Sequence, residues 1–411
     1  MSDAPEKEQD QPEPKLDGRG SALQVLSIFT RLGFASFGGP VAHLGYFREE
    51  FVERRKWFDE QTYADIVALC QFLPGPASSQ VGIAIGLTRA GIRGALGAWL
   101  GFTLPSAIIL ILFAYGVSAW GDIADSGWLN GLKIVAVAVV AQALWGMATN
   151  LCPDRERASI AVAAAILVLA WPIVGMQVGV IVLGGLIGWL FLARSELGTI
   201  TALRVPISRT FAIGSIVVFL LLLGGLPLAR LVVDSYTFDL VDSFYRTGSL
   251  VFGGGHVVLP LIQSEVVPTG WVHPDDFVAG YGAAQAVPGP LFTFAAYLGA
   301  VSTMSPAGWI GGTIALVAIF VPSFLLVFGA LPFWDQLRTR VGFQTALKGI
   351  NAAVVGLLLA ALYDPVFTSA ILRPLDFALA LVAFALLAFW KLPPWLVVIL
   401  TAAGGAIIAQ F

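Results

Sequence analysis

The residues best suited to bind a ligand belong to a short motif that occurs twice, as QFLPGP at residues 71–76 and as QAVPGP at residues 285–290. In each copy a glutamine precedes a Pro-Gly-Pro turn inside an apolar segment. Duplicated apolar segments that glycine and proline interrupt are typical of the binding sites of secondary transporters. The first question is therefore what chemistry such a turn can perform.

Each Pro-Gly-Pro turn predicts two helix ends that could bind an anion. The first proline ends one helix, the glycine permits the reversal, and the second proline starts the next helix. A helix start offers free N–H groups at the positive end of its dipole. Alternatively, the turn is a kink that only shapes packing, and the glutamines join two hairpins. The candidate substrate-binding residues are Gln71, Pro74, Gly75, Pro76, Ser78, Ser79, Gln285, Pro288, Gly289, Pro290 and Thr293.

A second duplicated motif, FGGP at residues 37–40 and FGGG at residues 252–255, precedes each turn. Paired glycines let a ligand or another backbone come close. A histidine near each copy could donate to an anion or carry a proton. Glycine pairs also serve helix packing, and the histidines could be structural. The candidate binding residues of this motif are Gly38, Gly39, Pro40, His43, Gly253, Gly254, Gly255 and His256.

Two pairs of cations, Arg31 with Arg246 and Lys133 with Lys348, also recur in the duplicated apolar segments. Charges within a membrane are costly and usually functional. No carboxylate recurs in the long apolar runs, so we expect cations without matching carboxylates and an anionic substrate. Guanidinium groups and helix N–H groups suit a tetrahedral oxyanion. The arginines could instead bind carbonyl groups, and the lysines could extend to the membrane interface.

Composition sets the class of protein that must position these residues. The 411-residue chain is 57% hydrophobic and 12% charged, about half the charge of a soluble domain. Several apolar stretches exceed the roughly 20 residues that cross a bilayer. We expect an all-α polytopic membrane protein without cofactor, metal site or nucleic acid partner. Two distant cysteines and no GxxxxGK[ST] loop disfavour a disulfide scaffold and direct use of ATP.

The two copies carry opposite charges in equivalent loops. Residues 47–60 include Arg48, Arg54, Arg55 and Lys56, whereas residues 264–276 have no lysine or arginine and include Glu265, Asp275 and Asp276. Because positive loops favour the cytoplasm, we predict that the two halves have inverted topologies. The predicted parts are a disordered cytoplasmic tail (1–20), a first membrane repeat (21–193), a cytoplasmic linker with an inverting helix (194–241) and a second repeat (242–411).

This topology also predicts how the interrupted segments fold. If the tail, residues 47–60 and residues 88–93 all lie inside, then residues 21–46 and 62–87 cannot each cross once. We predict re-entrant hairpins of short or broken helices whose tips meet near the bilayer midplane, where such backbone must line a cavity or be buried in protein. In the competing interpretation, each segment is one kinked crossing.

With these motifs in hand, the chain resembles the long, two-domain form of the chromate transporter family. The resemblance rests on FGGPVAHLGYF at 37–47, QFLPGP, FGGGHVVLPLI at 252–262 and QAVPGP. It implies a bacterial inner-membrane transporter that exports chromate, confers chromate resistance and has a tie to sulfate. Gly255 stands where the first copy has Pro40, so the halves need not contribute equally.

The predicted function is export of a divalent tetrahedral oxyanion by alternating access between inverted repeats. The N-terminus is expected in the cytoplasm and the C-terminus in the periplasm. The expected partners are a small inorganic oxyanion and the lipid bilayer, with a homodimer left open. The alternatives are an anion channel, a porter for a different anion or for a cation, and an intramembrane Ser/His hydrolase. The last is disfavoured because the chain has no GxSxG-type elbow.

Overall fold

The computed structural model describes residues 20–37, 39–119, 127–171, 174–192, 207–251, 258–334 and 341–410. Within these ranges the chain is helical and contains no strand. Five described helices are long and apolar enough to cross a membrane, which agrees with the expected polytopic class. They lie within residues 77–117, 127–151, 209–230, 308–333 and 344–370.

The first half contains short helices followed by longer ones. A break at Ala90 and Gly91, where the glycine has φ of +62°, divides the longest helix into two limbs. The elements are α1 (Ala22–Ala35), α2 (Gly39–Arg48), the π-helical turn η1 (Glu49–Arg54), α3 (Glu60–Phe72), α4 (Ala77–Ala119), α5 (Gly127–Leu151), α6 (Arg155–Ala170) and α7 (Val174–Phe191).

The second half repeats this order after one additional helix, α8 (Arg209–Arg230). Helices α9 to α13 correspond in order to α1 to α4, and α15, α17 and α18 correspond to α5, α6 and α7. The elements are α9 (Tyr236–Leu250), α10 (Val258–Val266), α11 (Pro274–Ala286), η4 (Leu291–Thr293), α12 (Phe294–Val301), α13 (Gly308–Ala330), η5 (Leu331–Phe333), α15 (Val341–Ala361), η6 (Leu362–Phe367), α16 (Thr368–Ala370), α17 (Pro374–Ala388) and α18 (Pro394–Ile408).

The short helices of the first half fold back as two hairpins. Helix α1 has 14 residues and α2 has 10, so they are about 21 and 15 Å long, less than the roughly 30 Å of a bilayer core. The N–H of Gly20 donates to the carbonyl oxygen of Arg89 over 3.1 Å, and the Arg89 guanidinium lies 4.8 Å from the centre of the Trp57 ring. Residues 20, 57 and 89 therefore share one end, as hairpins require and single kinked crossings do not.

The second half has the same two hairpins. The ring centres of Tyr236 and Trp271 lie 5.1 Å apart, and the Tyr236 hydroxyl lies 2.6 Å from Ser302 Oγ. The N–H of Thr303 donates to the Trp271 carbonyl oxygen over 2.9 Å. The chain thus returns to one end after α10 and again after α12. We call these shared ends the first and second open ends of the molecule.

The hairpin tips of the two halves meet through a reciprocal pair of hydrogen bonds. The N–H of Gly75 donates to the carbonyl oxygen of Val251 over 2.6 Å, and the N–H of Gly289 donates to that of Ser36 over 2.9 Å. Gly75 and Gly289 have φ of +121° and +106°, which side-chain-bearing residues rarely adopt. Each proline-flanked turn is therefore held by the other half of the chain.

The second limb of α4 runs from the first open end to the second. Near its start a Cβ on Gly101 would lie 2.6 Å from the Leu26 carbonyl oxygen, so it packs closely on α1. Farther along, Ser106 contacts the Gly289 tip, and the Tyr115 hydroxyl accepts the N–H of Trp309 over 3.2 Å. The two open ends therefore lie at opposite ends of this limb, with the tips between them.

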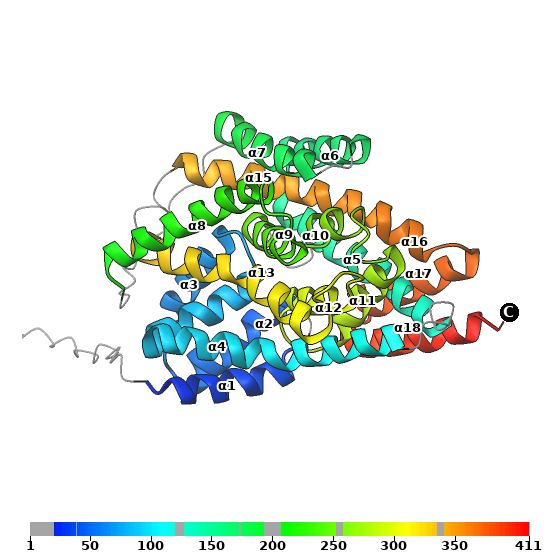
Figure 1. Ribbon diagram of the computed structural model, residues 1–411, viewed down its shortest axis with the longest axis horizontal. Helices are drawn as coiled ribbons and strands as arrows, with labels where there is room; N and C mark the ends of the chain where they lie inside the picture. Colours follow the sequence, from blue (N-terminus) through cyan, green and yellow to red (C-terminus); the bar gives the residue numbers. More distant parts are fainter. Residues whose placement is uncertain are drawn as a thin grey trace, which may run out of the picture.

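The remaining helices pack on the other half of the chain rather than on their own. Helices α6 and α7 lie outside α15, whereas α17 and α18 lie beside α5 (Figure 1). Glycines permit these close contacts: Gly184 of α7 faces Gly349 of α15, and Gly131 of α5 faces Ala402 of α18. The two halves are thus interlocked.

Replacement of either tip glycine by alanine should destabilise the fold. A Cβ on Gly75 would lie 2.6 Å from Gln80 Nε2, and one on Gly289 would lie 2.8 Å from Ser106 Oγ, in addition to the unfavourable φ. We expect Gly75→Ala and Gly289→Ala each to lower the free energy of unfolding by about 1–3 kcal/mol. Thermal unfolding in detergent measures this. Gly116→Ala, where a Cβ meets nothing within 4 Å, is the control and should unfold like the wild type.

Candidate functional site

A cavity of about 590 Å³ lies where the hairpin tips meet α5 and α15. Both predicted glutamines and both turn glycines line it, and so does the start of α2. The lining residues are Gly39, Pro40, Leu44, Cys70, Gln71, Leu73, Gly75, Ala77, Val139, Gln142, Ala143, Gly146, Met147, Asn150, Leu151, Ala284, Gln285, Val287, Gly289, Leu291, Asn351 and Pro394.

The polar groups that line the cavity are neutral. They are the amides of Gln71, Gln142, Asn150, Gln285 and Asn351, and no charged side chain belongs to the described lining. The Gln285 Nε2 is buried and has no hydrogen-bond partner in the described part of the chain. A buried donor without a partner is costly, so this amide has capacity for a ligand acceptor.

Helix starts supply further donors. The first residues of α2, α4 and the α12 segment (Gly39, Ala77 and Leu291) all line the cavity. The first N–H groups of a helix have no partner within the helix, and the dipole favours negative charge there. Cavity chemistry therefore suits an acceptor-rich, negatively charged solute that needs no counter-charge from a side chain.

The predicted hydroxyl and histidine donors lie behind the tips and are absent from the described lining. His43 is 1% exposed, and its Nδ1 lies 3.3 Å from Ser78 Oγ. Ser79 is also buried. Thr293 donates to the carbonyl oxygen of Pro290 over 2.7 Å, so its hydroxyl proton is used locally. Around the first turn, the Gln80 amide donates to the Pro74 carbonyl oxygen over 2.6 Å, and the Gln80 N–H donates to that of Pro76 over 2.9 Å.

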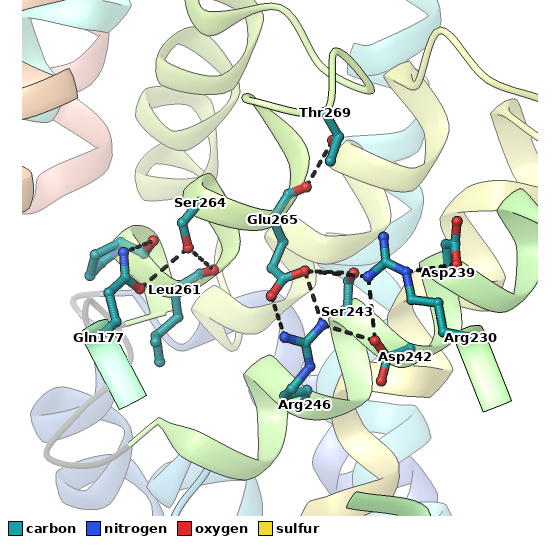
Figure 2. Close-up of polar contacts among 11 residues, drawn as sticks. Gln177, Arg230, Asp239, Asp242, Ser243, Arg246, Leu261, Ser264, Glu265 and Thr269 are labelled. Carbon is teal, nitrogen blue, oxygen red and sulfur yellow. Dashed lines mark hydrogen bonds and ion pairs between the residues drawn. The ribbon is translucent and has the colours of Figure 1, made fainter. Parts of the chain in front are cut away.

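Arg246 and Lys133 have carboxylate partners, which corrects the expectation of unmatched charges. Arg246 contacts Asp242 Oδ2 and Glu265 Oε1, each over 2.8 Å, and Arg230 lies beside both acids (Figure 2). Lys133 donates to Asp275 Oδ1 over 2.8 Å. The expectation was wrong because it considered only the long apolar runs. These acids lie on α9, α10 and α11, the short helices of the hairpins.

The other predicted residues have different surroundings. Arg31 is exposed on α1, and within the described ranges no ion pair involves it. Lys348 is half-buried on α15. Pro288 flanks the Gly289 turn outside the described lining. The remaining predicted residues, Gly38, Gly253, Gly254, Gly255 and His256, lie outside the described residues.

Sequence reasoning missed three amides of the cavity: Gln142, Asn150 and Asn351. Gln142 and Asn150 belong to α5 and Asn351 to α15. Each is an uncharged polar residue within a long apolar stretch, which is a detectable signal. Their roles were not predicted because they are not duplicated: Ala136 stands 215 residues before Asn351.

The chain resembles known proteins along most of its length. A sequence model of the chromate transporter family matches it twice, over residues 23–189 and 238–407. A chromate transport protein of Pseudomonas aeruginosa is 25% identical over 93% of this chain and 90% of its own length. One of Cupriavidus metallidurans is 26% identical over 90% of this chain and 88% of its own. An uncharacterized transporter of Methanocaldococcus jannaschii is 28% identical over 83% of each. No solved structure matches significantly.

The different surroundings of Arg31 and Arg246 predict different effects on stability. Arg246→Met would leave the buried carboxylates of Asp242 and Glu265 with Arg230 alone, at 3.5 and 3.9 Å, so we expect a loss of about 1–3 kcal/mol. Arg31→Met removes an exposed side chain and should change stability by less than about 0.5 kcal/mol. Thermal unfolding of both variants in detergent measures the difference, and equal losses would contradict this assignment.

Proposed function

The chain belongs to the chromate transporter family, and we propose that it carries a divalent tetrahedral oxyanion, chromate or sulfate, across the membrane through the cavity between the hairpin tips. The observation that carries the proposal is the unpartnered Gln285 amide in a cavity where three helices begin. Two relatives named as chromate transport proteins, each matching at least 90% of this chain, support the choice of substrate.

In the proposed site, neutral donors bind the oxyanion. The amides of Gln71, Gln285 and Asn351 reach its oxygens, and the starts of α4 and α12 add backbone N–H groups. A hydrogen bond to a charged group contributes about 1.5–3 kcal/mol, so several such bonds can replace part of the hydration shell. Arg246 is engaged by carboxylates, so we assign it a structural role near the second open end instead of contact with the substrate.

A site without a fixed positive charge is suited to release as well as to binding. A buried guanidinium would attract a dianion strongly and slow its dissociation. Amides and helix dipoles offer shallower binding at a site that must load and unload in each cycle. The cavity composition therefore favours a carrier of moderate affinity.

We further propose that the halves have inverted topologies and move alternately. Support comes from the second limb of α4. The hairpins of the first half open at the start of this limb, and the hairpins of the second half open at its end. The first open end carries Arg54, Arg55, Lys56 and Arg89, and we assign it to the cytoplasm. With the acidic second end outside, the N-terminus is cytoplasmic and the protein lies in the inner membrane of a bacterium.

The membrane potential is sufficient to drive export. It contributes roughly 2.3 kcal/mol per charge per 100 mV, hence about 4.6 kcal/mol for a dianion. That free energy supports a gradient of roughly a thousandfold. Exchange of the dianion for sulfate moves no net charge, so the membrane potential would not drive it.

Removing a cavity amide should impair transport. Gln285→Leu and Gln71→Leu keep the side-chain size but leave the dehydrated anion one donor short, so initial chromate flux into inverted vesicles should fall about 10–100-fold. Gln263→Leu, an amide outside the described cavity lining, is the control and should retain wild-type flux. Normal flux in both cavity variants would remove the proposed site, and flux that never saturates would favour an anion channel.

The proposed inversion has a separate test. Cysteines introduced at Lys56 and Pro268, both exposed near the two open ends, should react with a membrane-impermeant maleimide from opposite faces. In intact cells only the Pro268→Cys protein should be labelled, and in inverted vesicles only the Lys56→Cys protein. Labelling of both from one face would contradict the inverted arrangement.

A further inference from the structure

The two halves carry the same arginine and glutamate at the same positions of their first hairpins. Arg31 and Glu50 lie in the α1–α2–η1 hairpin, and Arg246 and Glu265 lie in the α9–α10 hairpin. Arg246 lies 215 positions after Arg31, and Glu265 lies 215 positions after Glu50. If the two hairpins had the same conformation, both pairs would make the same contact.

In the second half this contact is formed. Arg246 Nη1 lies 2.8 Å from Glu265 Oε1, and Nη2 lies 3.1 Å from Oε2 (Figure 2). Ser243 Oγ donates to the same carboxylate over 2.8 Å, and Asp242 adds a second ion pair with Arg246. Glu265 and Asp242 are buried, so this ion pair ties α9 to α10 near the second open end.

In the first half the equivalent contact is not formed. Glu50 instead accepts hydrogen bonds from Arg54 Nη1 over 3.0 Å and from Arg55 Nε over 2.6 Å. Arg31 is exposed and takes part in no ion pair within the described ranges. The ion pair between the duplicated arginine and glutamate is therefore formed in the α9–α10 hairpin and is absent from the described part of the α1–α2–η1 hairpin.

Both glutamates have a second arginine that can replace the first. For Glu50 it is Arg54 or Arg55, which bind it here. For the Glu265 and Asp242 carboxylates it is Arg230, which lies 3.9 and 3.5 Å from them and also binds Asp239 over 2.8 Å. A buried carboxylate that loses its cation is strongly unfavourable. In either hairpin the arginine can leave without this cost, because a second arginine remains beside the carboxylate. Exchange of one guanidinium for another changes the electrostatic energy little, so the two arrangements can be close in free energy.

We propose that Arg31 and Glu50 are positioning residues for transport, which form in the opposite conformation the ion pair that Arg246 and Glu265 form here. When access alternates, the Arg246–Glu265 pair opens and the Arg31–Glu50 pair closes, so that one hairpin is tied at a time. This exchange rests on alternating access by the proposed function. It explains why the arginines recur although neither lines the described cavity.

Cross-linking tests whether each pair comes into contact. In a Cys152→Ser background that retains the fully buried Cys70, we would compare Arg31→Cys/Glu50→Cys with Arg246→Cys/Glu265→Cys. Copper phenanthroline should join either pair in membranes, because a disulfide needs only transient approach of the two Cα atoms to about 4.4–6.8 Å. Each disulfide removes two free thiols, so the protein gains two fewer polyethylene glycol maleimide groups. The four proteins with one introduced cysteine show whether any of these residues forms a disulfide with Cys70 instead.

A protein with all four introduced cysteines distinguishes exchange from fixed asymmetry. Exchange predicts molecules with one disulfide at either pair, never both. Formation of the 246–265 disulfide alone, or of both disulfides in one molecule, would overturn the inference. Cross-linking does not require chromate to be the substrate. Mutually exclusive disulfides, together with a wild-type protein that moves no chromate, would therefore support the exchange and reject the proposed substrate.

Charge reversal gives a second readout that a purely structural role would not produce. Arg31→Glu and Glu50→Arg should each lower flux at least about threefold, and the double variant should recover most of it, because residues in contact show coupled effects. Detergent stability of Arg31→Glu should stay near wild type, because Arg31 is exposed. Glu50→Arg breaks the ion pairs with Arg54 and Arg55, so its flux is compared at equal amounts of folded protein. Additive losses in the double variant would show that the two residues do not meet during transport.

Discussion

The reciprocal hydrogen bonds between the hairpin tips are the constraint on which the rest of the structure depends. Each Pro-Gly-Pro turn interrupts a helix and exposes backbone groups that a low-dielectric environment cannot satisfy. Gly75 gives its N–H to Val251, and Gly289 gives its N–H to Ser36, so each half supplies what the other lacks. The arrangement closes only when the two turns converge, and the amide-lined cavity lies beside them.

The distribution of charge follows from the same geometry. Ionised groups lie toward the open ends of the hairpins, as with Arg246 against Glu265 and Lys133 against Asp275. The described lining of the cavity keeps neutral amides and helix starts. Fixed charges can thus organise the scaffold without binding the solute too tightly. This division separates the residues that hold the hairpins from those that we propose to contact the substrate.

The sequence predicted the helical class, the hairpins and the meeting of their tips, because glycine and proline act locally and the duplication repeats the signal. Gln71, Gln285, Gly75 and Gly289 line one cavity, and their binding of a ligand stays a prediction. Sequence reasoning failed for Arg246, because whether a charge is paired depends on acids that tertiary folding brings from other helices. It also missed Asn351, because a single amide on a long apolar helix carries no indication of the face it presents.

The interlocked packing of the two halves has a consequence for biogenesis. Helix α7 rests on α15, whose first residue is made about 150 positions after α7 ends, and at roughly 5–20 residues per second this takes about 8–30 s. During that interval the newly inserted first half presents Gly184 and Gly188 to lipid without their partner. The first half can therefore complete its packing only after α15 has been synthesised and inserted.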